Sequence, residues 1–203
     1  MARTIRNSGR GRRGFTLIEL MIVMAIVVIA GSILIIQMNP ARGQANVNTA
    51  FNTVMTTLRS ARETAISQRK NYTVTFNPTG YPANSMTTTL VDTNSVISST
   101  TLPTGVAFDL ESGLPSSPPA NQLDGMGGGT SAIAFDVGVS GTPTNSITFM
   151  PDGSAVDANF NYNFGIVYLA QPGNKLSSRA ITVLGPTGRI RGWRYTGSYW
   201  FTL

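Results

Sequence analysis

The sequence predicts an α+β protein, in which a long N-terminal α-helix packs on a mostly antiparallel β-sheet domain. Two observations indicate this fold class. Apolar residues dominate positions 15–38 and then recur at helical spacing to about Gln68, whereas from Tyr72 the pattern changes to the two-residue period of strands. The chain has 203 residues, enough for one globular domain with an N-terminal appendage.

Residues 15–38 form an apolar run with a single charge, Glu19. As a helix, this run is about 36 Å long at ~1.5 Å per residue, whereas the hydrocarbon core of a bilayer is ~30 Å thick. It is therefore long enough to span a membrane. Five arginines precede it, and the positive-inside rule then places the rest of the chain outside the cytoplasm: Arg3, Arg6, Arg10, Arg12 and Arg13.

Taken alone, these residues leave two ordinary interpretations open. The run could be a cleavable secretory signal with a cut near Val28-Ile29-Ala30, although apolar residues continue through residues 33–36. It could instead be a plain signal anchor. In that case Glu19 is an incidental acid near the membrane interface, favoured by the helix dipole.

The helix is predicted to continue through residues 39–70. Pro40 removes a backbone donor and should kink or locally open the helix, and the region from Gly31 to Pro40 is expected to extend on assembly. Beyond it lies one apolar stripe predicted to face the sheet: Val47, Phe51, Val54, Leu58, Ala61 and Ala65. The charged residues of this segment are expected to form a solvated face or subunit contacts: Arg59, Arg62, Arg69 and Lys70.

Seven segments of the remaining chain, residues 71–203, have the composition and alternation of strands: 72–76, 86–91, 131–137, 146–149, 164–170, 179–184 and 188–195. Residues 98–130 are rich in Pro and Gly and predict a long surface loop, either a carrier of partner specificity or, the favoured interpretation, a tolerated insertion.

Catalysis and metal binding find little support in the composition. The chain has no Cys and no His, and its acids lack the spacing that would pair them for acid–base chemistry. The glycine-rich stretch GMGGGTS lacks the lysine of a phosphate-binding loop. Asp152 and Asp157 are interpreted as turn residues rather than calcium ligands. We therefore expect no enzyme activity, no cofactor and no metal.

The net charge of +6 is unevenly distributed along the chain. Residues 1–14 carry +5, residues 71–174 carry −7, and residues 175–203 carry +5 with no acid. Period-two alternation in residues 188–195 places Arg189, Arg191, Trp193 and Tyr195 on one strand face and Arg194 on the other. Arginines beside aromatic residues suit phosphate contact and base stacking, and Lys175 and Arg179 could extend the patch. The alternative is a solvated strand, or arginines that bridge to acids of a neighbouring subunit.

The stretch RRGFTLIELMIVMAIVVIA resembles the processing site and helix start of type IV pilins and type II secretion pseudopilins. The resemblance implies that a prepilin peptidase cuts after Gly14 and methylates the new amine of Phe15. It also implies that Glu19 contacts the N-terminal amine of a neighbouring subunit during assembly. A buried carboxylate is tolerable when paired, so this contact would fix the stagger between subunits.

Two later stretches, ITFMPDGSA (147–155) and RAITVLGPTGRIR (179–191), resemble the GspH/FimT branch of minor pilins and pseudopilins. The Gly-Arg-Ile-Arg sequence also looks like the tail by which FimT-type minor pilins of competence pili hold DNA. Resemblance covers both ends of the chain and hardly touches residues 77–130.

Together these observations predict a leader (1–14), a membrane and assembly helix (15–38), its amphipathic continuation (39–70) and a β-rich domain (71–203). The expected function is a non-enzymatic filament subunit of a type IV pilus or type II secretion system, held in the bacterial inner membrane until assembly. Its expected partners are other pilin subunits, the peptidase, the inner-membrane assembly platform and lipid. One alternative is a DNA-binding minor pilin. Another is a membrane-anchored extracytoplasmic binding protein that forms no filament.

Overall fold

The computed structural model describes residues 14–80, 82–115, 123–127, 130–135 and 143–203, with the side chains of residues 33–41 left out of the description. The predicted leader, residues 1–14, lies outside the described residues except for Gly14. The chain divides into two compact units, residues 1–41 and 42–203.

Helix α1 runs from Leu17 to Gln68 and contributes to both units. The predicted helix, Phe15 to about Gln68, is confirmed to within two residues. Thr16 is the N-cap of α1, because its Oγ1 accepts a hydrogen bond from the Glu19 amide at 3.3 Å. The helical assignment continues through residues 31–41, so the local opening predicted at Pro40 is not seen.

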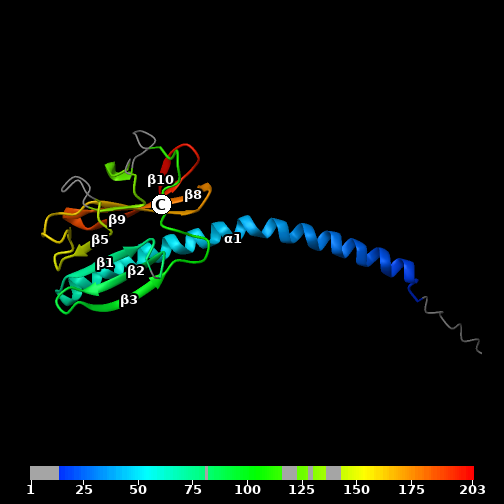
Figure 1. Cartoon of the computed structure of the whole chain (residues 1–203), viewed down its shortest axis with the longest axis horizontal. Coiled ribbons are helices and arrows are strands. Elements are labelled where there is room, and N and C mark those ends of the chain that lie inside the picture. The colour runs from blue at the N-terminus through cyan, green and yellow to red at the C-terminus, as the bar shows by residue number, and fades with distance from the viewer. Residues whose placement is uncertain (1–13, 81, 116–122, 128–129, 136–142) are drawn as a thin grey trace, which may run out of the picture. The chain divides into compact units, whose positions relative to one another are not determined.

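The described residues of the second unit form ten strands in two sheets, and Figure 1 shows their arrangement. The first sheet has the order β3-β2-β1-β5-β6 and the second has the order β10-β9-β8-β7-β4. All strand pairs between the described strands are antiparallel, as predicted. The strands are β1 (Tyr72–Asn77), β2 (Ser85–Leu90), β3 (Ser95–Thr101), β4 (Ile133–Phe135), β5 (Ser146–Phe149), β6 (Ala155–Val156), β7 (Gly165–Gln171), β8 (Asn174–Leu184), β9 (Arg189–Tyr195) and β10 (Trp200–Thr202).

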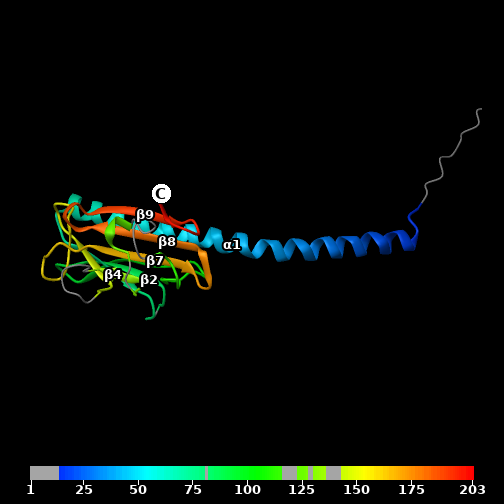
Figure 2. The same ribbon diagram turned by 90° about the horizontal axis from the view of Figure 1, so that it is seen from above.

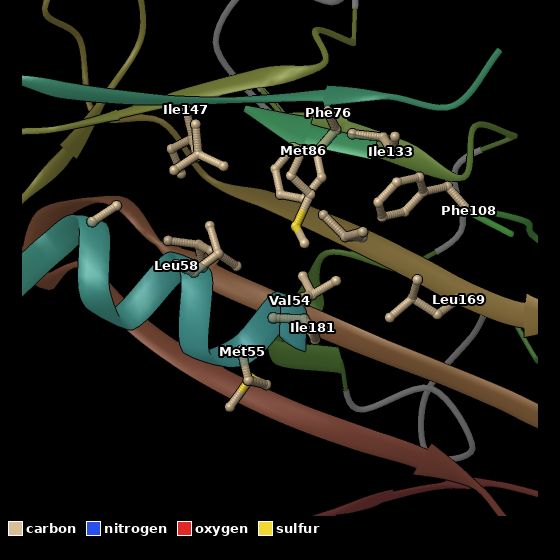
Figure 3. Close-up of a cluster of buried hydrophobic side chains, with 14 of the residues drawn as sticks. Val54, Met55, Leu58, Phe76, Met86, Phe108, Ile133, Ile147, Leu169 and Ile181 are labelled. Atoms are coloured by element: carbon tan, nitrogen blue, oxygen red, sulfur yellow. The ribbon is translucent and has the colours of Figure 1, made fainter. Parts of the chain in front are cut away.

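The larger hydrophobic core lies between α1 and the two sheets. All six residues of the predicted helix stripe are buried, which confirms the face that packs on the sheets. Figure 3 shows side chains from α1, from the first sheet and from the second sheet in one cluster, among them Val54, Leu58, Phe76, Met86, Ile147, Leu169 and Ile181. Gly192 of β9 permits the close approach of α1, because a Cβ there would collide with the ring of Phe51.

A second core lies on the opposite face of the second sheet, whose strands β7, β8 and β9 run side by side in Figure 2. Tyr168, Trp193, Tyr195 and Trp200 form this core, and Leu123 and Met126 cover it. Every residue of both cores lies within residues 42–203. Among the described residues, this unit therefore contains all of the hydrophobic core.

The prediction of a loop, and in particular of a tolerated insertion, over residues 98–130 is therefore wrong in two respects. Residues 98–101 belong to strand β3. Leu102, Val106 and Phe108 enter the larger core, whereas Leu123 and Met126 enter the second. The segment contributes apolar side chains to both cores. Residues 116–122 and 128–129 lie outside the described residues.

Candidate functional site

The first candidate region is the apolar start of α1. Every large hydrophobic side chain from Phe15 to Ile29 is more than half exposed in the isolated chain, with Phe15 at 80%. Glu19 lies within this surface, and its carboxylate has no ion-pair partner among the described residues. Such a surface requires lipid or other protein to cover it.

Thr16 is a residue of this region that the sequence analysis did not single out. Its hydroxyl caps the helix at Glu19, which occupies the third helical position. The signal was present in the sequence as Thr-Leu-Ile-Glu, the pattern of a capping box. The cap holds the Glu19 carboxylate in the first turn, where the helix dipole favours a negative charge.

The second candidate region is formed by Arg189 and Arg191 on β9. Both guanidinium groups contact one carboxylate, that of Asp124: Arg191 Nη1 lies 2.6 Å and Arg189 Nη2 lies 3.2 Å from Asp124 Oδ1. The Asp124 side chain is only 9% exposed, whereas those of Arg189 and Arg191 are 47% and 36% exposed. Two cations therefore share one internal anion, and the cluster keeps a positive excess at the surface.

Asp124 also connects the arginines to the core. Its Oδ2 accepts a hydrogen bond from Thr182 Oγ1 at 2.6 Å, and Thr182 Oγ1 accepts one from Trp193 Nε1 at 3.0 Å. The Arg191 guanidinium carbon lies 5.5 Å from the centroid of the Trp193 ring. Because Trp193 is 2% exposed, the prediction that its ring could stack on a base is wrong in this structure.

Arg179 and Arg194 lie on the other face of the second sheet, as cross-strand neighbours. Arg179 is buried and donates to the carbonyls of Ser177 and Ser178 and to Asn48 Oδ1 of α1. Burial, with a smaller contribution from the charge of Arg194, lowers the pKa of Arg179 to about 10. Arg179 is thus a structural residue, and the prediction that it extends a surface patch is wrong.

Lys175 lies elsewhere on β8, near the turn that follows β7. Its Nζ donates to the carbonyl of Gly113 at 3.2 Å, and the neighbouring Gly173 amide donates to Glu111 Oε1 at 2.5 Å. Lys175 therefore helps attach the 102–115 segment to the second sheet. The predicted basic and aromatic residues therefore do not form one patch.

Arg62 of α1 joins two turns that are far apart in the sequence. Its Nε donates to the carbonyl of Gly153 at 2.9 Å, and its Nη2 donates to that of Thr187 at 3.0 Å. Thr187 belongs to the short 3₁₀ helix η2 (Gly185–Thr187) between β8 and β9. Arg62 is half-buried, so the prediction of a solvated or subunit-contact charge does not describe it.

Asp152 and Asp157 each accept hydrogen bonds from residues of their own turn, which agrees with their prediction as turn residues. Asp152 accepts hydrogen bonds from the hydroxyl and the amide of Ser154, which lower the pKa of Asp152. Asp157 accepts from the amides of Asn159 and Asn161 and from the Asn161 side chain. Among the described residues, no group of three or more His, Cys, Asp or Glu is placed to hold a metal ion.

Within the part of the chain that the structure describes, no helix is both long and apolar enough to cross a membrane. The predicted span, residues 15–38, includes residues 33–38, whose side chains lie outside that description.

Comparison with known proteins gives two family matches. The family model of the prokaryotic N-terminal methylation motif matches residues 9–35. The family model of the type II transport protein GspH matches residues 50–188. No curated protein matches the chain.

Two crystal structures of the type IV minor pilin FimU of Pseudomonas aeruginosa, in space groups P21 and P65, are similar to this chain with a TM-score of 0.43 each. They are 13% and 14% identical to it. The matches cover 71% of this chain and 85% and 90% of theirs.

A long N-terminal helix that carries the methylation motif and packs on antiparallel sheets defines a type IV pilin-like protein. The chain belongs to the GspH family, whose model covers more than half of its length. The methylation motif implies prepilin processing and a membrane-anchored pilin with an extracellular domain. Family and fold are those of structural pilins rather than enzymes.

Proposed function

We propose that the chain is a minor pilin or pseudopilin that prepilin peptidase cuts after Gly14 and methylates at the amine of Phe15. The processed subunit resides in the bacterial inner membrane and is assembled through α1 by the inner-membrane platform of a type IV pilus or type II secretion system. The observation that carries this proposal is the exposed apolar surface from Phe15 to Ile29 with Glu19 in its first turn.

Electrostatics gives Glu19 its role in this proposal. Cutting after Gly14 creates a cationic amine at Phe15, and an unpaired carboxylate or amine in an apolar setting is costly. When helices of neighbouring subunits pack side by side, the Glu19 carboxylate of one can pair with the amine of the next. Side-by-side packing at this stagger satisfies both charges and covers both apolar surfaces.

Charge neutralisation of Glu19 tests the assembly role. We expect Glu19→Gln and Glu19→Leu to leave cleavage after Gly14 intact and to lower the amount of subunit recovered in sheared filaments severalfold. Glu63→Gln removes the same charge from an exposed position farther along α1 and should assemble like the wild type. Normal incorporation of both Glu19 variants would contradict the proposed pairing.

A second candidate function is DNA binding, and it is favoured by the positive excess on β9. Arg189 and Arg191 offer two partly exposed guanidinium groups against the single carboxylate of Asp124. Phosphate contact by arginine needs such exposure and depends on salt through counterion release. Because Trp193 is buried, this function rests on phosphate contacts rather than on base stacking.

The double variant Arg189→Gln/Arg191→Gln tests DNA binding by residues 42–203. We expect weaker binding of a labelled oligonucleotide. The slope of log affinity against log salt should also be shallower by about 0.7–0.9 for each phosphate that the variant no longer neutralises. Arg179→Gln changes a buried arginine on the opposite face and should leave the slope unchanged. Absence of any wild-type binding at low salt would rule out this function.

A further inference from the structure

A cleft of about 350 Å³ lies between α1 and the start of β9. Arg59, Arg62 and Glu63 line it from α1, and residues 187–190 line it from η2 and β9, including Arg189. Among the described residues that line the cleft, three carry guanidinium groups and one carries a carboxylate. The cleft adjoins the arginines of the proposed DNA-binding strand through Arg189.

Two of the three arginines are held in place by the fold. Two backbone carbonyls, those of Gly153 and Thr187, fix Arg62. Asp124 fixes Arg189 through one terminal nitrogen. Gly188 keeps the wall open, because a Cβ there would lie 2.8 Å from Arg62 Nε. Such a preorganised set of donors loses little side-chain entropy when it binds an anion.

Arg59 remains available for a ligand. It lies one helical turn before Glu63, yet no ion pair joins the two side chains among the described residues. No described residue therefore neutralises its guanidinium at ion-pair distance. The cleft keeps a positive excess and is chemically suited to a phosphate or a carboxylate.

The acids of the described chain argue against a second copy as the source of that anion. Most of these carboxylates already accept hydrogen bonds or form ion pairs within their own chain, so they are less available to a neighbouring copy: Asp92, Glu111, Asp124, Asp152 and Asp157. A polyanion whose backbone also reaches Arg189 and Arg191 fits the arrangement better, because one strand of phosphates can contact adjacent groups in succession.

We propose that this cleft binds a backbone phosphate of DNA, with Arg59 and Arg189 as contact residues and Arg62 as a positioning residue. The inference rests on the proposed DNA binding by β9 and extends it onto α1. The DNA contact then runs from the second sheet to the helix, rather than being confined to the C-terminal strand. Glu63 opposes binding because its carboxylate lines the same cleft.

The test uses residues 42–203 and a labelled oligonucleotide, single-stranded and duplex, titrated at several salt concentrations. We expect Arg59→Gln to weaken binding severalfold and to reduce the salt slope by about 0.7–0.9. Glu63→Gln should strengthen binding. Arg42→Gln is the matched control, since it removes the same charge about 25 Å along the same helix at ~1.5 Å per residue, outside the cleft.

The two cleft variants are expected to change DNA affinity in opposite directions. This distinguishes an effect of the cleft from misfolding, because a misfolded variant would not bind DNA more tightly. One result would overturn DNA binding by the cleft and leave DNA binding by β9 standing. In that result, Arg59→Gln and Arg42→Gln bind DNA with the affinity of the wild type, whereas Arg189→Gln/Arg191→Gln binds more weakly. Failure of the wild type to bind either probe would overturn both. Asp92→Asn is a second control, because Asp92 is remote in sequence and lies outside the cleft. If Asp92→Asn raises the affinity for DNA as much as Glu63→Gln does, net charge alone explains the increase. That result would also overturn the proposal that the cleft binds DNA.

Discussion

Gly188 lies at the junction of α1 with the turns that follow β5 and β8. Its φ of 56° is in the left-handed region. A Cβ at this position would collide with the carbonyl oxygen of Gly153 and crowd Arg62. The hydrogen bonds from Arg62 to Gly153 and Thr187 therefore require a residue without a Cβ at position 188. One glycine and one arginine fix how the helix meets the second sheet at this end.

Gly188→Ala is expected to lower the free energy of unfolding of residues 42–203 by about 1–3 kcal/mol more than Gly173→Ala. Gly173 is the matched control, because it also has a left-handed φ, 81°, but a Cβ there would have nothing within 4 Å. Urea denaturation of the two variants measures the difference. Equal destabilisation would show that backbone conformation, rather than the contact with Gly153 and Arg62, explains the effect.

At the scale of elements, residues 102–115 and 123–126 contribute side chains to both cores, and Asp124 ties residues 123–126 to the second sheet. Asp124 has a positive φ of 53° and accepts hydrogen bonds from Thr182, Arg189 and Arg191. Charge-assisted hydrogen bonds at a side chain that is 9% exposed are among the stronger polar contacts. The β9 arginines therefore have a structural role that coexists with the proposed ligand contact.

Asp124→Asn should lower the free energy of unfolding by about 1–3 kcal/mol, because it weakens these charge-assisted bonds to two arginines and a threonine. Asp92→Asn provides the comparison. Asp92 forms an exposed ion pair with Lys70 at 3.8 Å, and such pairs contribute about 0–1 kcal/mol. Thermal or urea unfolding measures both variants. A destabilisation by Asp124→Asn no larger than that by Asp92→Asn would contradict the role of Asp124 as an attachment point.

Strong periodicity made most elements predictable. The helix stripe and the strands β1, β2, β5, β7, β8 and β9 were found because apolar residues repeat at helical or two-residue spacing over enough positions. Strand β3 was placed largely within a loop, since SVISSTT lies at a sheet edge with six of its seven residues exposed and has no core face to give alternation. Strands β6 and β10 have two and three residues, too few to establish a period.

The candidate sites were predicted less completely, because their contacts join residues distant in sequence. Alternation correctly separated Arg194 from Arg191 and Trp193. It could not show that Arg179 is buried against Asn48, 131 positions away, or that Arg62 reaches Gly153 and Thr187. Asp124 lay in a segment interpreted as an insertion, so its pairing with the arginines had no local signal.

At the scale of the whole molecule, the distribution of charge agrees with the proposed processing. Removal of residues 1–14 takes away five arginines and leaves a net charge of about +1 in place of +6. The basic character of the processed chain then lies mainly in its last 29 residues and in the helix arginines. Under the proposed processing, the amine exposed at Phe15 would supply the cation that Glu19 lacks in the described chain.

The most direct test of this account is mass spectrometry of the N-terminus of the protein purified from cells that contain prepilin peptidase. We predict a mature chain that begins at Phe15 and carries one methyl group on its amine, and an unprocessed chain when the peptidase is absent. An intact leader in the presence of the peptidase, or a cut near Ala30 by a signal peptidase, would contradict the filament-subunit function. An intact leader would favour a membrane-anchored binding protein, and a cut near Ala30 would favour a secreted one.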